Sequence, residues 1–173
     1  MGGLNLDAEV LALAAVLRAR GWRMASAESC TGGLIAAACT AVAGSSDWFE
    51  RGFVSYSNAA KTDLLGVAPA LIEAHGAVSE PVVRAMALGA LQHAPVQLAV
   101  AVTGIAGPGG AVPGKPVGTV WLAVASTASS PESGFASTVF VERLQLDGDR
   151  TAVRNATVVR ALLRLHEAAS RPV

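Results

Sequence analysis

The sequence predicts an α/β fold, a single domain in which a mixed sheet lies between two layers of helices as a three-layer α/β/α sandwich. Segments with a helical apolar pattern alternate with short, nearly continuous apolar runs, which are typical of strands buried on both faces. Hydrophobic residues make up 52% of the chain and aromatic residues only 5%, so the apolar mass is mostly Ala, Val and Leu. These side chains suit helices packed closely against a buried sheet. With 173 residues and no visible repeat or linker, the chain has the size of one domain.

The first part of the chain is predicted to contain two helices and two strands. Residues 7–20 form an amphipathic pattern, and Gly21 is the expected stop signal. Residues 22–27 are expected to form a short strand. An alanine-rich helix is expected over residues 34–42, and the apolar residues 53–54 indicate another short strand.

Three further helices are predicted between this strand and the centre of the sheet. Asn58 can cap a first short helix, and Pro69 lies where a first-turn proline belongs in a second one, which Gly76 ends. A longer helix is expected from Ser79 to about His93.

The last part of the chain is predicted to supply the remaining strands and a final helix. Residues 97–102 and 119–125 have the composition of buried strands. Residues 126–133 are expected to form a polar surface turn, and residues 138–144 a third strand that can pair as a hairpin. Asp149 is expected to cap the final helix.

Composition and spacing exclude several classes of function. The formal net charge is zero and there is no basic run, so we expect no nucleic-acid partner. We expect no membrane partner either but a soluble, cytoplasmic protein, because no apolar segment reaches spanning length and the N-terminus lacks a signal pattern. Cys30 and Cys39 are too few for a disulfide framework, and no Cys/His cluster has ligand spacing, so we expect no metal.

Two glycine-rich loops are candidate binding elements. Residues 31–33 open a helix, where free backbone N–H groups can hold an anion. The structural alternative is an N-cap by Ser29 or Thr31, and the two are compatible. Residues 104–110 follow a buried strand, and such loops tend to converge on one crevice. Neither loop fits a P-loop or a dinucleotide fingerprint, so no cofactor is expected.

A third candidate element surrounds the short strand at residues 53–54. Ser46 precedes this strand, and Tyr56 and Lys61 follow it. A hydroxyl, a phenol and an amine are the parts of a metal-free hydrolase of the serine–lysine kind. Ser46 and Lys61 can meet only if the chain folds back or turns into a helix at Asn58. The alternative is that the serine caps or turns the chain and Lys61 is a solvated helix residue.

Several short fragments appear along the chain in the order and at the spacing of a known family. They are Ala27-Glu28-Ser29-Cys30-Thr31-Gly32-Gly33, Gly44-Ser45-Ser46, Tyr56-Ser57-Asn58, Lys61, Gly76-Ala77-Val78-Ser79, Thr103-Gly104-Ile105-Ala106-Gly107-Pro108 and Lys115-Pro116-Val117-Gly118-Thr119-Val120. With this set the chain resembles the CinA C-terminal domain family, the bacterial nicotinamide mononucleotide deamidases of the PncC type. The resemblance covers nearly the whole chain. It departs at Gly109, where the family often has an acidic or polar residue.

The resemblance implies an α/β/α enzyme that hydrolyses the carboxamide of nicotinamide mononucleotide to nicotinate mononucleotide and ammonia, in pyridine nucleotide salvage. It places the nucleophile on Ser46, the general base on Lys61 and a supporting tyrosine on Tyr56. Together with the glycine loops, it gives a substrate-binding set of Ser29, Thr31, Gly32, Gly33, Thr103, Gly104 and Arg143. Arg143 and Arg150 both remain candidates for the phosphate. We expect the stand-alone form of the family, without its extra N-terminal domain, and a homo-oligomer, with a dimer favoured.

The chemistry of amide hydrolysis is consistent with this assignment. A serine hydroxyl needs a base, no His/Asp pair is placed to serve, and the lysines are Lys61 and Lys115. Lowering a lysine pKa from about 10.4 by about three units costs about 4 kcal/mol, which apolar burial or a nearby positive charge can supply.

Two other readings of these residues remain open. Cys30, at a helix start, could act as a thiolate, whereas Glu28 is expected to pair with a cation or cap a helix. A non-catalytic nucleotide-binding or regulatory module is the alternative for the whole chain.

Overall fold

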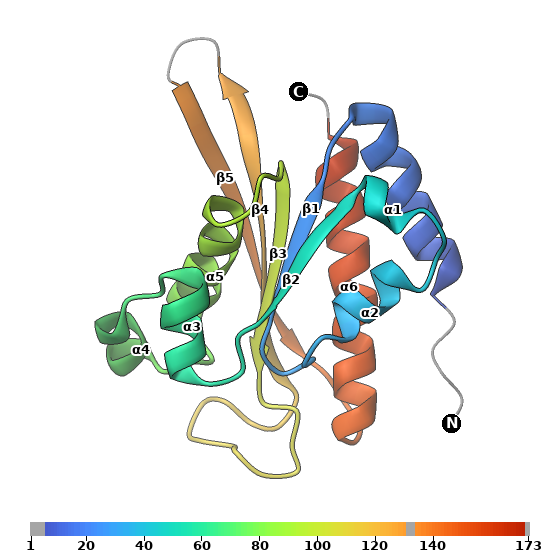
Figure 1. Ribbon diagram of the computed structural model, residues 1–173. Coiled ribbons are helices and arrows are strands. Elements are labelled where there is room, and N and C mark those ends of the chain that lie inside the picture. The colour runs from blue at the N-terminus through green and yellow to red at the C-terminus, as the bar shows by residue number, and fades with distance from the viewer. Residues whose placement is uncertain (1–5, 131–133, 172–173) are drawn as a thin grey trace.

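The computed structural model describes residues 6–130 and 134–171, which form three layers (Figure 1). The middle layer is a five-stranded sheet in the order β2-β1-β3-β4-β5. Its strands are β1 (Met24–Glu28), β2 (Phe49–Val54), β3 (Leu98–Gly104), β4 (Thr119–Ser130) and β5 (Gly134–Gln145). One face carries α1 (Asp7–Arg20), α2 (Leu34–Thr40) and α6 (Arg150–Ser170), and the other carries α3 (Asn58–Leu65), α4 (Pro69–His75) and α5 (Glu80–Gln92). The predicted α/β/α sandwich around a mixed sheet is confirmed.

The sheet topology brings the ends of several strands to one edge. Strand β1 pairs in parallel with both β2 and β3, whereas β3–β4 and β4–β5 are antiparallel. The carboxyl ends of β1, β2 and β3 therefore lie together at the lower edge of the sheet in Figure 1. In parallel sheets this edge is where ligand crevices form.

The two faces of the central strand β3 carry side chains of different size. Leu98, Val100 and Val102 face the core beneath α1 and α6, while Ala99 and Ala101 alternate toward α5. The small side chains let α5 pack closely on the sheet. All of these residues are fully buried, and burying each larger side chain stabilises the fold by about 1.5–3 kcal/mol.

The hairpin of β4 and β5 differs most from the sequence prediction. The strands pair without interruption from Thr119 with Gln145 to Ser130 with Gly134. The polar residues 126–130, predicted as a turn, therefore belong to β4, and the rest of that prediction, residues 131–133, lies outside the described residues. Beyond Leu98, where β3 begins and pairs with Ser126, the hairpin continues as a two-stranded ribbon at the top of Figure 1. A two-stranded ribbon outside the layers of helices has no buried face that requires apolar residues.

The helix termini mostly follow their sequence signals. Gly21 ends α1 in the left-handed conformation with φ of 62°, and Asp149 caps α6 by accepting a hydrogen bond from the Ala152 N–H. The cap of α3 is Ser57, whose hydroxyl accepts from the Ala60 N–H, and the predicted cap Asn58 is the first helical residue. Among the described residues, none of the helices combines the length and the apolar character that crossing a bilayer requires.

Candidate active site

A cavity of about 200 Å³ lies at the edge of the sheet where β1 and β3 end. It is lined by Ser29, Cys30, Tyr56, Asn58, Lys61, Ala77, Val78, Thr103, Gly104, Ala106 and Arg150. These residues come from the turns after β1, β2 and β3, from the last two residues of β3, from the first half of α3, from the segment before α5 and from the first residue of α6. The cavity is therefore a crevice at the carboxyl ends of parallel strands.

Lys61 is the buried amine of this cavity. Its side chain is 1% exposed, and its Nζ donates hydrogen bonds to the Ser55 carbonyl (2.9 Å), the Tyr56 carbonyl (3.1 Å) and Ser29 Oγ (3.1 Å). Burial lowers the pKa of Lys61, against a smaller opposing effect of the Cys30 sulfur. No carboxylate lies within 4.0 Å of Nζ in the described ranges.

The hydrogen bonds around Lys61 suit a neutral amine as well as an ammonium. A neutral amine has two N–H donors and one lone pair. The carbonyls of Ser55 and Tyr56 can accept from the two donors, and the lone pair can then accept the proton of the Ser29 hydroxyl. The geometry is that of a serine nucleophile beside a lysine base.

Ser29 is held rigidly at the end of β1. Its N–H donates to the Val102 carbonyl of β3 at 3.1 Å, which ties the turn to the neighbouring strand. Its side chain is buried, its hydroxyl contacts Lys61 Nζ, and both residues line the cavity. The resemblance implied that Ser29 binds substrate, and the structure shows that its hydroxyl contacts the Lys61 amine.

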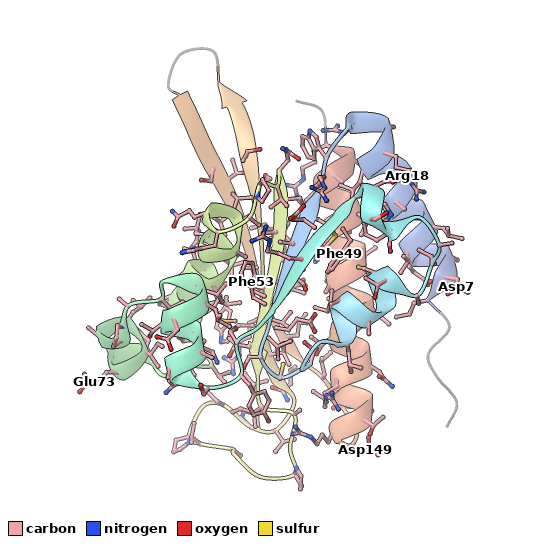
Figure 2. The ribbon with its side chains drawn as sticks, viewed as in Figure 1. Asp7, Arg18, Phe49, Phe53, Glu73 and Asp149 are labelled. Atoms are coloured by element: carbon pink, nitrogen blue, oxygen red, sulfur yellow. The ribbon has the colours of Figure 1, made fainter. Side chains whose placement is uncertain are left out.

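Ser46 lies at the opposite end of β2 from Lys61. It belongs to the short 3₁₀ helix η1 (Ser45–Asp47) that precedes β2, whereas Lys61 belongs to α3, which follows that strand. Figure 2 marks the two ends of β2 with Phe49 and Phe53. At about 3.3 Å per residue the strand is about 20 Å long. Ser46 is exposed and does not line the cavity, so the expected Ser46–Lys61 pair is not formed in this fold.

The glycine turn before α2 holds an anion, but that anion is the side chain of Glu28. The carboxylate of Glu28 accepts hydrogen bonds from the N–H groups of Gly33, Ile35 and Ala36 at 2.8–3.0 Å. The expected substrate-binding residues Thr31, Gly32 and Gly33 do not line the cavity. The helix end is capped from β1 by Glu28, not by Ser29 or Thr31, and the expectation that Glu28 caps a helix is confirmed.

Tyr56 and Arg150 form the outer wall of the cavity. The Tyr56 side chain is 60% exposed, and its hydroxyl accepts a hydrogen bond from Arg150 Nη2 at 3.3 Å. Arg150 Nη1 donates to the Gly107 carbonyl at 3.0 Å. Arg150 also lines a neighbouring cavity of about 480 Å³ together with Ala106 and Asp149, whose place at the start of α6 is labelled in Figure 2.

Arg143 lies outside the cavity, contrary to expectation. It is exposed on β5, and its Nη2 donates to the Gly114 carbonyl at 2.8 Å. Its contact holds the loop between β3 and β4 from the outside. Arg150 is therefore the arginine that the fold brings to the cavity.

Thr103 and Gly104 line the inner wall of the cavity as expected. The Thr103 hydroxyl donates to the Ala77 carbonyl at 2.9 Å, so it fixes the segment before α5 against the end of β3. At Gly104, an added Cβ would lie 2.6 Å from Val120 Cγ2 and 2.9 Å from the Thr119 carbonyl oxygen. Only glycine lets β4 approach this closely.

The cavity edge of the sheet is rich in cations without carboxylate partners. Lys115, Arg143 and Arg150 each donate to a backbone carbonyl, and none of them forms a salt bridge within the described part of the chain. Such an arrangement attracts an anionic ligand. In residues 6–130 and 134–171 no group of three or more His, Cys, Asp or Glu residues could hold a metal ion.

Some lining residues were not assigned to the site from the sequence. Asn58 was expected as a helix cap and quoted within a family fragment, Arg150 was an alternative for the phosphate, and Ala77, Val78 and Ala106 were quoted only within family fragments. The available signal was position in the sequence, because each residue lies just after a strand, in the segment before a helix, or at a helix start, and these places lie at the same edge of the sheet.

The chain matches the model of the CinA C-terminal domain over residues 7–169. It is 53% identical over 150 residues to "Nicotinamide-nucleotide amidohydrolase PncC" of Enterobacter agglomerans, covering 87% of each chain. It is 49% identical over 149 residues to the protein of the same name in Escherichia coli strain K12, covering 86% of each. It is also 53% identical over 165 residues to a "CinA-like protein" of Mycolicibacterium gilvum, covering 94% of this chain but only 36% of that longer protein.

Solved structures show the same fold. The competence/damage inducible protein CihA from Agrobacterium tumefaciens superposes with a TM-score of 0.85 at 42% identity, covering 99% of this chain and 100% of that one. Competence damage-inducible protein A from Klebsiella pneumoniae superposes with a TM-score of 0.85 at 38% identity, covering 94% and 96% of the two chains.

Proposed function

The chain belongs to the CinA C-terminal domain family, and from that premise we propose that it hydrolyses the carboxamide of nicotinamide mononucleotide to nicotinate mononucleotide and ammonia, in pyridine nucleotide salvage. The similar proteins named nicotinamide-nucleotide amidohydrolase are matched over most of their length, which supports the same activity here. The observation that carries the chemical part of the proposal is the 3.1 Å contact between Lys61 Nζ and Ser29 Oγ.

In the proposed mechanism Ser29 is the nucleophile and Lys61 the general base. Neutral Lys61 takes the hydroxyl proton as Ser29 Oγ bonds to the carboxamide carbon. The backbone N–H of Cys30, in the same turn, is our candidate donor to the developing oxyanion. The C–N bond then breaks, Lys61 returns the proton to the leaving nitrogen, and ammonia departs.

The second half of the reaction uses water. The acyl group is now an ester on Ser29, and neutral Lys61 takes a proton from water as the water oxygen bonds to the acyl carbon. Collapse of this second tetrahedral intermediate breaks the ester bond and returns the proton to Ser29 Oγ. The product forms as the carboxylic acid, loses its proton to solvent and leaves as the carboxylate, and Lys61 and Ser29 are regenerated for another turnover.

Cys30 is a poor alternative nucleophile in this site. Burial is the main cause that raises the pKa of the Cys30 thiol to about 11, and the Glu28 charge contributes in the same direction. At neutral pH the sulfur is therefore a thiol, and the thiolate is the reactive form. Ser29, in contact with a base, is the better candidate for the nucleophile.

Arg150 is the proposed contact for the phosphate of the substrate. The mononucleotide is an anion, and Arg150 joins the catalytic cavity to the larger neighbouring one. A guanidinium forms strong, paired hydrogen bonds with phosphate oxygens. Lys115 and Arg143, which lie at the same edge of the sheet, would attract the negatively charged phosphate through space without contacting it.

The test is ammonia release from nicotinamide mononucleotide by the purified protein. We expect multiple turnovers by the wild type and none above background by Ser29→Ala, with the mononucleotide still bound in a calorimetric titration. A non-catalytic nucleotide-binding module would bind the mononucleotide equally well in both proteins and release no ammonia from either. That result would overturn the proposal.

A further inference from the structure

We propose that Glu28 is the positioning residue of the nucleophile, a buried carboxylate that fixes the Ser29 turn at the distance at which Lys61 can act. This inference rests on the proposed serine–lysine mechanism. Glu28 itself does not line the cavity, so it would act through the turn and not by touching the substrate.

The Glu28 carboxylate is fully enclosed by hydrogen-bond donors. Its side chain is 1% exposed. One oxygen accepts from Thr31 Oγ1 at 2.7 Å and from the N–H groups of Gly33 and Ile35, each at 3.0 Å. The other oxygen accepts from the Ala36 N–H at 2.8 Å and from Ser26 Oγ at 3.1 Å.

These donors lie on both sides of Ser29 in the chain. Ser26 belongs to β1, which precedes Ser29, while Thr31 and Gly33 belong to the turn that follows it. The carboxylate therefore clamps the strand to the turn across the nucleophile. From α6, Arg154 Nη2 donates to the Thr31 carbonyl at 2.9 Å and holds the same turn from outside.

Glu28 accepts more hydrogen bonds than an ordinary helix cap does. The capping side chain usually belongs to the N-cap residue, which here is Gly33, and it accepts one or two N–H groups. Glu28 instead reaches the helix from β1, and no cation lies within 4.0 Å of it in the described residues. A buried charge is tolerated only when its hydrogen bonds are all made, so the geometry of the turn is closely fixed.

A purely structural role makes a different prediction from a positioning role. If Glu28 only stabilises the fold, loss of any one of its donors should lower stability and leave the rate per folded molecule unchanged. If it positions Ser29, loss of a donor on the turn side should lower that rate, whereas loss of a donor on the strand side should not.

The matched pair of variants is Thr31→Ala and Ser26→Ala, which each remove one buried hydroxyl donor to the same carboxylate. Thr31→Ser restores the donor on the turn side. For each protein we would measure kcat and KM per folded molecule and the thermal unfolding midpoint. We would also measure the rate at which a fluorophosphonate labels Ser29, a step in which Ser29 Oγ displaces fluoride from phosphorus and Lys61 takes the proton.

We expect Thr31→Ala to lower kcat and the labelling rate by about tenfold or more, because small misplacements of reacting groups are costly, with KM little changed. Ser26→Ala should stay within about twofold of the wild type in both rates, and Thr31→Ser should recover most of the loss. Both alanine variants should lose similar thermal stability.

Wild-type rates per folded molecule in both Thr31→Ala and Ser26→Ala, at a similar loss of stability, would show that Glu28 is only a structural cap, and equally lowered rates in both would likewise overturn the proposed difference between the two sides of the turn. Either result would leave the proposed function standing if Ser29→Ala is inactive. Conversely, if the wild type releases no ammonia from the mononucleotide, the proposed function fails, and the labelling rates still decide the role of Glu28.

Discussion

The two ends of the sheet both present a serine beside a turn, but only one of them is built for chemistry. At the end with Ser29 the nearest amine is buried, has no carboxylate within 4.0 Å among the described residues, and contacts the serine directly. At the end with Ser46 the serine is exposed, and nearby arginines are paired with acids, Arg23 with Glu50 and Arg18 with Asp47. The comparison teaches that burial and the absence of a counter-charge, more than residue type, distinguish an amine that can act as a base from a surface cation.

The largest effect should come from the buried amine. Arginine keeps the positive charge of Lys61 but does not deprotonate in proteins. We expect Lys61→Arg to lower turnover of the mononucleotide by at least about a hundredfold, the low end for loss of a general base. Steady-state ammonia release, with circular dichroism as the folding control, measures this. Near-wild-type turnover would mean that Lys61 supplies only charge, and Tyr56 would then be the first suspect for the base.

The pH dependence of the rate should report the same amine. Because burial lowers the pKa of Lys61, the neutral amine becomes populated at a lower pH than for a free lysine, whose pKa is about 10.4. We expect kcat/KM to rise with pH, by about tenfold per unit below that pKa, and to level off above it. A value of kcat/KM that falls as pH rises from neutral would contradict the assignment of Lys61 as the base, because the neutral amine, which is the active form, becomes more populated as pH rises.

A smaller effect should separate the two arginines of the cavity edge. Arg150 lines both cavities, while Arg143 contacts only the outside of the loop. Arg150→Ala should raise KM for the mononucleotide by about tenfold or more, as expected for a lost hydrogen bond to a charged group, and Arg143→Ala by much less. The same measurements with nicotinamide riboside should show little difference between the variants. Equal effects on the mononucleotide would place the phosphate elsewhere.

The smallest effect on activity should come from an ion-pair cluster away from the site. Hydrogen bonds from Arg164 and then Arg160 lower the pKa of Glu142 to about 2. Because the folded pKa lies below the unfolded value, the cluster stabilises the fold above about pH 4.3, and this contribution is lost as pH falls toward about 2.

Glu142→Gln should therefore lower stability at pH 7 by about 1 kcal/mol and leave ammonia release unchanged. Urea unfolding at pH 7 and near pH 2 measures the loss of stability. The difference in the free energy of unfolding between Glu142→Gln and the wild type should shrink at the lower pH. A difference that is the same at both pH values would show that the charge of Glu142 is not the source of the stability.

The fold could be predicted because its signals are local. Neighbouring residues alone indicate where α1 stops (Gly21) and where α4 and α6 start (Pro69 and Asp149). The buried apolar runs of β3 and β4 can also be recognised locally. The length of the β4–β5 hairpin could not be read, because a ribbon that extends past the sheet has no buried face to impose an apolar alternation.

The site was predictable in its parts but not in its pairing. Lys61, Tyr56 and Ser29 were all identified, yet the family resemblance placed the nucleophile on Ser46, which does not line the cavity. Strand β2 lies between Ser46 and Lys61 and holds them at its opposite ends. Parallel pairing of β1 with β2, in contrast, brings Ser29 at the end of β1 beside α3, which carries Lys61. The anion site before α2 was likewise recognised, but its occupant, Glu28, depends on a side chain that folds back from β1.

The most direct test of which serine is the nucleophile compares Ser29→Ala with Ser46→Ala in the same ammonia-release assay. Ser29 contacts Lys61 at 3.1 Å, and Ser46 lies at the far end of β2. We expect Ser29→Ala to lose turnover to background while it still binds the mononucleotide, and Ser46→Ala to turn over at close to the wild-type rate. An inactive Ser46→Ala beside an active Ser29→Ala would contradict the account.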